Sequence, residues 1–176
     1  MKYTRFFAMI GVSTIAMFIM MYLNTYALSH IWFSETRTYM ALYMGAGMAV
    51  IMLAFMLSMY TDSRKNIAIF AGAVILFVAC LYLLRSQLLV SDSAYMKGMI
   101  PHHSIAILTS ERSQLEDQRV RELANGIIRA QRKEIKEMEW LIKDIEKNGK
   151  AVTREEAEAR PVPEFSGQLK PGGNNE

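Results

Sequence analysis

Cysteine is almost absent from the chain, which carries only Cys80 among its 176 residues. One cysteine can form neither a disulfide within the chain nor a CxxC site. A small domain held together by disulfides is therefore excluded, and so is a site built on several thiolates. Cys80 lies inside a long apolar stretch, where it is expected to be a small packed residue.

Charge is missing from the interior of three long stretches, residues 6–28, 38–60 and 67–84. About 20 apolar residues in a helix span the roughly 30 Å hydrocarbon core of a bilayer. The three stretches therefore predict three membrane-spanning helices joined by short connectors. The domain containing them is expected to cover residues 1–90, as an up-down-up helical bundle.

Excess charge of one sign is also missing from the second half of the chain. Residues 1–90 hold six basic and two acidic residues, which leaves 14 basic and 15 acidic residues after position 90. A near balance of this kind gives no patch for a polyanion, so nucleic acid is not an expected partner.

The basic residues of the first half favour one orientation in the membrane. Four of them flank the ends that are cytoplasmic if the N-terminus is inside, namely Lys2, Arg5, Arg64 and Lys65. The other ends carry Arg37 and Arg85, and positive charge accumulates on the cytoplasmic side. We therefore expect a membrane protein with a cytoplasmic N-terminus and a C-terminal domain on the outer, periplasmic-type side. A cleaved signal peptide over residues 1–27 is the alternative, but no small-x-small cleavage site follows it.

Residues 91–149 predict a hairpin of two helices. Ser91 and Asp117 are suited to begin the helices as N-caps, and Asn148-Gly149 is suited to end the second one. The second helix carries a stripe with helical spacing: Leu123, Ile127, Gln131, Glu134, Ile135, Met138, Leu141, Ile142 and Ile145. Residues 150–176, rich in Glu, Pro and Gly, predict a disordered tail with about one helical turn.

Two helices alone leave apolar surface uncovered, because helical bundles normally close with four. The stripe must meet either a second copy of the chain or the membrane-proximal ends of the spans. The simplest expectation is an all-α protein whose hairpin completes a four-helix bundle in a homodimer.

Thioether and imidazole side chains gather in one short segment. Met96, Met99, His102 and His103 are spaced by three or four residues, which places them on one side of a helix around Pro101. This ligand combination suits copper, and thioethers favour Cu(I). The segment therefore predicts a copper site, with a polar patch between subunits as the alternative.

Two residues of the second helix are candidates for the same site. Glu134 could orient a histidine through its other ring nitrogen or ligate the metal directly, and Met138 could add a thioether. Core packing is the commoner role of a methionine on such a stripe. The methionines at every fourth position of the second span, from Met40 to Met56, also have a packing interpretation beside that of a Cu(I) ladder.

The run from Met99 to His103, followed by Ala106-Ile107, resembles the signature of the DUF305 family. So does the later pattern Leu123-Ala124, Ile127-Ile128, Ala130-Gln131, Glu134-Ile135 and Met138. The resemblance implies a ferritin-like helical domain of the bacterial envelope, in a family some of whose members are associated with copper. It supports Met99, His102, His103 and Met138 as ligands. Where many members have Gln and Met, this chain has Ser104 and Leu108, and it has one helical unit instead of repeated ones.

Together these observations predict a membrane-anchored module that binds copper for sequestration or relay, with a metal-handling envelope protein as a partner. The alternative is an interaction protein whose hairpin recruits a partner through Tyr95 and Trp140. An enzyme is not expected, because the chain has no Glu-x-x-His, HExxH, nucleophile-elbow or phosphate-loop motif. No organic cofactor is expected either.

Overall fold

A computed structural model describes residues 2–169, and most of these residues lie in helices. They divide into two compact units. The first contains residues up to 23 together with 34–90, and the second contains residues 24–33 together with those from 91 onward. The connector between the first two spans thus belongs, by its contacts, to the unit of the C-terminal hairpin.

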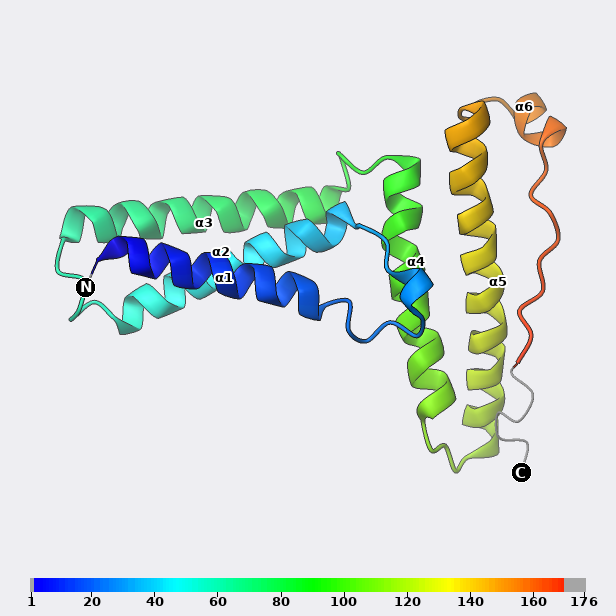
Figure 1. The fold of residues 1–176 in the computed structure, drawn as a ribbon, viewed down its shortest axis with the longest axis horizontal. Coiled ribbons are helices and arrows are strands. Elements are labelled where there is room, and N and C mark those ends of the chain that lie inside the picture. Colours follow the sequence, from blue (N-terminus) through cyan, green and yellow to red (C-terminus); the bar gives the residue numbers. More distant parts are fainter. Residues whose placement is uncertain (1, 170–176) are drawn as a thin grey trace. The chain divides into compact units, whose positions relative to one another are not determined.

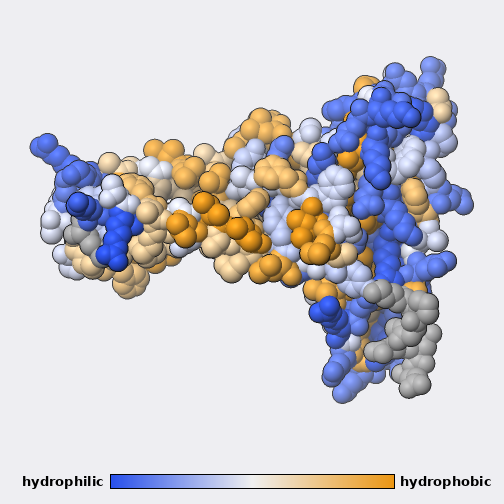
Figure 2. Space-filling view, in the orientation of Figure 1, coloured by the Kyte–Doolittle hydropathy of each residue, from blue (hydrophilic) through white to orange (hydrophobic). Residues whose placement is uncertain are grey.

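The first unit consists of the helices α1 (Tyr3–Met20), α2 (Glu35–Phe55) and α3 (Ser63–Ser86) (Figure 1). By length and composition all three can cross a membrane, as the sequence predicts. Figure 2 shows largely apolar surface over these helices, as lipid contact requires. A chain of this kind resides in a lipid bilayer.

Local capping explains where two of these helices begin. The Ser34 hydroxyl accepts a hydrogen bond from the Arg37 amide at 3.2 Å, and the Asp62 carboxylate accepts one from the Lys65 amide at 3.2 Å. Helix α1 ends at Met20, eight residues before the end expected for its span. The following residues leave the apolar period at Asn24 and Thr25 and join the second unit.

A small apolar core holds the three helices together around Phe6, Leu53 and Tyr60. Gly45 permits the close approach of α1 and α2, because a Cβ at this position would collide with the Thr14 side chain. Met52 and Met56 pack against the same core, which favours the packing interpretation of the methionines of α2.

The second unit is an antiparallel hairpin of α4 (Asp92–Arg112) and α5 (Gln118–Asn148) (Figure 1). The expected caps are confirmed: Ser91 accepts from the Ala94 amide, Asp117 accepts from the Arg119 amide, and Gly149 ends α5 with a φ of 77°. A short 3-10 turn, Leu28–His30, lies in the connector.

The buried face of α5 differs from the expected stripe at its N-terminal end. Ala124 and Ile128 are buried there, whereas Leu123 is 64% exposed and Ile127 is 36% exposed. Further along, the stripe is confirmed by the buried Ile135, Met138 and Ile142.

The segment expected to be a disordered tail includes one short helix in the structure. It contains α6 (Arg154–Ala159), begun by a capping box of Thr153 and Glu156. The chain then runs back along α5 (Figure 1), where the Lys136 ammonium donates to the Ser166 carbonyl at 2.8 Å. Composition alone did not reveal these contacts, which are made by charged groups. Residues 170–176 of the expected tail lie outside the described residues.

Candidate metal centre

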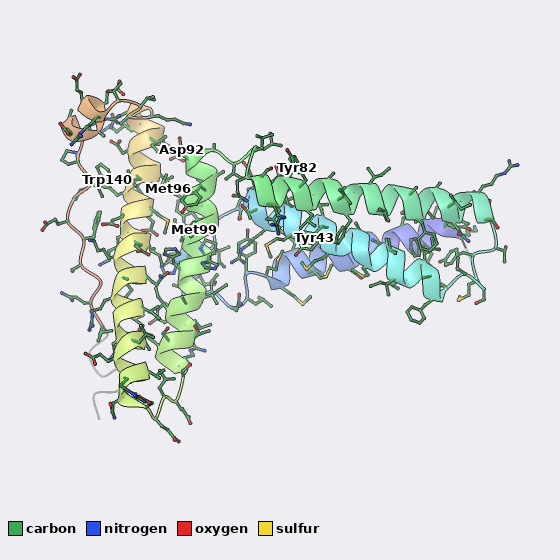
Figure 3. The ribbon with its side chains drawn as sticks, turned by 180° about the vertical axis from the view of Figure 1, so that it is seen from behind. Tyr43, Tyr82, Asp92, Met96, Met99 and Trp140 are labelled. Atoms are coloured by element: carbon green, nitrogen blue, oxygen red, sulfur yellow. The ribbon has the colours of Figure 1, made fainter. Side chains whose placement is uncertain are left out.

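Helix α4 divides the predicted ligands between two environments. Met96 is 6% exposed inside the hairpin core, and Met99 packs against that core from its edge (Figure 3). His103 is half-buried, whereas His102 is exposed. Successive residues of a helix are turned by about 100°, so adjacent histidines cannot both face the partner helix.

His103 faces α5 and meets the predicted Glu134. Its Nδ1 atom lies 3.0 Å from Glu134 Oε2, and the ring is 13% exposed. The two atoms approach without the alignment of a formed hydrogen bond, so Nδ1 is buried with its hydrogen-bonding capacity open. A small rotation of the Glu134 side chain, which is 45% exposed, would align them.

The surroundings of His103 favour the neutral ring. Burial is the main cause of a lowered pKa, which the Glu134 charge opposes and His102 reinforces. An imidazole must be neutral to ligate a metal, and a carboxylate on one ring nitrogen directs the other towards the ion. His103 with Glu134 therefore has the arrangement of a ligating histidine held by an orienting carboxylate.

Met138 lies on α5 between two contacts that fix the pairing of the helices. Lys97 meets Glu146 at 3.3 Å towards one end, and His103 meets Glu134 at 3.0 Å towards the other. Since the helices are antiparallel, Met138 lies level with the stretch of α4 from Met99 to His103. It is 9% exposed and belongs to the core that Met99 borders.

The two histidine rings are close but differently oriented. Their centroids are 6.1 Å apart and their planes meet at 60°. Two imidazoles on one ion have centroids roughly 5–6 Å apart, because each metal–nitrogen bond is about 2 Å long. The separation therefore permits a shared ion after a small turn of the exposed His102 ring.

Residues 24–33 supply contacts that the sequence analysis did not anticipate. Ser104, which has no exposed surface, accepts a hydrogen bond from the Tyr26 amide at 2.7 Å. Its hydroxyl is also 2.9 Å from His30 Nδ1, and Trp32 packs on the hairpin core. The connector thus covers part of the apolar surface for which the sequence predicts a second copy or the span ends.

This docking brings the third histidine of the chain to the residue next to His103. The pKa of His30 is lowered mainly by burial, against the opposing charge of Glu139. The only signal in the sequence was the isolation of His30 beside Trp32 in a connector. It could not show which surface the connector contacts.

Within residues 2–169, no group of three or more His, Cys, Asp or Glu side chains is arranged to hold a metal. A site made of nitrogen, thiolate and carboxylate ligands is therefore not present in the part of the chain described. Methionine thioethers are not among those ligand types. The Met/His combination of the hairpin is therefore the remaining candidate for a metal site.

The fold and this cluster define a class of protein: three candidate membrane spans followed by a helical hairpin that presents a histidine–carboxylate pair beside thioethers. Residues 92–171 match the family described as "Domain of unknown function (DUF305)". "Uncharacterized protein L153" of Acanthamoeba polyphaga mimivirus is 32% identical over 142 residues, covering 77% of this chain and 91% of that protein. The chain belongs to the DUF305 family.

The similarity to the viral protein is longer than the domain match, so it includes part of the chain before residue 92. No solved structure matches the chain.

Proposed function

We propose that the α4–α5 hairpin binds copper as Cu(I), and that the protein sequesters or relays the ion as its cargo from a membrane anchor. The observation that carries the proposal is the 3.0 Å contact between His103 Nδ1 and Glu134, made by a ring that burial keeps neutral. This contact leaves Nε2 as the ligating atom.

Besides the Glu134 carboxylate, the candidate donors at this level of the hairpin are soft. Met99 and Met138 lie at the same level of the hairpin, and thioethers with imidazole favour Cu(I) over harder cations. His102 can join from the exposed side, while Met96 is placed deeper in the core. We propose His103, Met99 and Met138 as the centre of the site, with Glu134 as the orienting residue.

The role proposed is binding, not catalysis. We place the hairpin on the periplasmic side of a bacterial inner membrane, on the basis of the four-to-two distribution of basic residues at the span ends. On that side a thioether has an advantage over a thiol, because it cannot be lost to a disulfide.

The first test is Cu(I) affinity, measured with the full chain in detergent under anaerobic conditions against a chromogenic Cu(I) chelator. The full chain is required because residues 24–33 form part of the hairpin's core. His103→Ala, and the pair Met99→Leu with Met138→Leu, should each weaken binding at least about tenfold. Glu134→Gln should weaken it by 10- to 100-fold, as loss of an orienting partner does.

Leucine conserves most of the apolar volume of methionine, so the double variant separates loss of thioethers from loss of packing. Met59→Leu, in the exposed turn after α2, is the matched control and should bind as the wild type does. Wild-type protein without affinity for Cu(I), or equal affinity in the control and the double variant, would refute the proposal.

Recruitment of a partner protein is the second candidate function. Tyr95 is 55% exposed at the start of α4, whereas Trp140 is half-buried on α5. Exposed aromatic residues are common anchors at interfaces. A partner retained by the wild type, lost with Tyr95→Ala and unchanged by His103→Ala would favour this function over copper binding.

A further inference from the structure

An apolar groove of about 690 Å³ runs between the three spans of the first unit. Helix α2 packs against both α1 and α3. Helices α1 and α3 touch near their N-terminal ends, where the Tyr3 hydroxyl donates to Asn66 Oδ1 at 2.8 Å. The groove lies between these two helices, with Gly45, Ala46 and Ala49 of α2 lining it as well. Its volume is within the range of small-molecule binding sites.

Small residues create this space. Gly11 of α1 and Gly72 of α3 both line the groove, and a Cβ added at either would meet no atom within 4 Å. The remaining wall is almost entirely hydrocarbon, for example Ile15 and Leu76. An apolar groove within the hydrocarbon region of the membrane is suited to bind a hydrocarbon chain.

The groove has the length of one leaflet. It reaches from Phe7 to Ile15 along α1 and from Ala68 to Leu76 along α3. Eight residues at a rise of 1.5 Å give about 12 Å, close to half of the roughly 30 Å hydrocarbon core. It therefore lies in the leaflet adjoining the N-terminal ends of α1 and α3.

Basic residues lie at the membrane depth where the headgroup of a lipid in this groove would lie. Arg5 is two residues before Phe7, and Arg64 is four residues before Ala68. Both are exposed, and neither takes part in the ion pairs of the described residues. Lys65 is paired with Asp62 at 2.8 Å, so the cations left to meet an anion are the two arginines and Lys2, which precedes α1.

We infer that this groove binds an acyl chain of an anionic phospholipid, whose phosphate is held by Arg5 and Arg64. A second copy of the chain fits this end less well. Two copies share one orientation in the bilayer, so the second would bring the same arginines to the same depth and add repulsion. The inference does not depend on copper binding.

The test compares dioleoylphosphatidylglycerol with dioleoylphosphatidylcholine, which have the same acyl chains, added to the full chain in a neutral detergent. Thermal stability and native mass spectrometry are the readouts. The anionic lipid should raise the Tm by several degrees more than the zwitterionic one and should remain bound in the gas phase. Equal effects of the two lipids would overturn the inference.

Filling the groove should abolish this effect. Gly72→Leu places a side chain in the open space, whereas the control Ala71→Leu adds the same atoms at the next position of α3, outside the groove. Gly11→Leu fills the groove from α1 and replaces Gly72→Leu should that variant fail to fold. Identical lipid responses of the filled variants and the control would overturn the inference.

Charge is tested separately. Arg5→Gln with Arg64→Gln should remove the preference for the anionic lipid, while Arg85→Gln, in the last turn of α3, should keep it. If Gly72→Leu instead turns a dimer into a monomer and no lipid is retained by the wild type, a second copy occupies the groove and the inference is wrong.

Discussion

At the scale of single residues, Ser104 determines how residues 24–33 meet the hairpin. Its hydroxyl accepts from the Tyr26 amide and lies beside His30 Nδ1, and no part of its surface is exposed. A longer side chain at this position would displace the connector. The Ser104 that departs from the family pattern thus has a structural role in this chain.

Protonation of His30 should weaken the docking of the connector on the hairpin. Burial lowers the folded-state pKa of His30 from its ordinary 6.5, so the unfolded chain binds the proton more readily. The contribution of neutral His30 to stability is therefore complete above pH 6.5 and is lost as the pH falls through the folded-state pKa. Trp32 fluorescence, followed in a Trp140→Phe background, should report release of the connector on acidification.

The control for this titration is His30→Gln, which keeps a hydrogen-bonding side chain but has no charge change. Its acid transition should be smaller and should begin at lower pH than that of the parent. Glu139 raises the pKa of His30, so Glu139→Gln should lower the folded-state pKa further, which increases the stability lost on acidification and moves release of the connector to higher pH. Coincident curves for parent and His30→Gln would show that His30 does not control the docking.

At the scale of elements, the helices were predictable where their signals are local. The caps at Ser91, Asp117 and Gly149 depend on neighbouring residues alone and were read from the sequence. The end of α1 and the position of the connector could not be predicted in this way, because they depend on a hydrogen bond from Tyr26 to Ser104, which lie 78 positions apart. The histidine–carboxylate pair of the site was predictable because both members lie on helical stripes.

The contacts of the segment after α6 were likewise not predictable from local signals in the sequence. Arg160 Nη1 lies 2.7 Å from Asp144 Oδ2, and both side chains are largely buried, which ties the segment after α6 to α5. Arg160→Ala should release this segment and increase hydrogen exchange at the capping-box amides of Thr153 and Glu156 by at least tenfold. Arg154→Ala is the control, because the Arg154–Glu158 pair is exposed and contributes little. Exchange that is already fast in the wild type would support the disordered tail that composition predicts.

At the scale of the whole molecule, the chain has two candidate surfaces for association. The spans offer their apolar exterior to lipid, and the hairpin keeps exposed apolar residues near its turn. The connector and the segment after α6 already contact other parts of the hairpin. A four-helix bundle formed by two copies therefore stays a prediction. The exposed apolar residues left for such a contact lie at the start of α5.

Val120, Leu123 and Ile127 are 45%, 64% and 36% exposed and follow one another by three and four residues, so they form one stripe on α5. Burial of a leucine side chain contributes about 1.5–3 kcal/mol, and 1.4 kcal/mol is tenfold in affinity. Leu123→Lys should therefore weaken a hairpin dimer at least about tenfold, measured as the mass of the full chain by light scattering over a dilution series in detergent. Val152→Lys, at a residue that is 83% exposed outside this stripe, should leave the mass unchanged. A dimer that survives Leu123→Lys combined with Ile127→Lys must be held by other surfaces, and the bundle closure predicted from two helices would then be wrong.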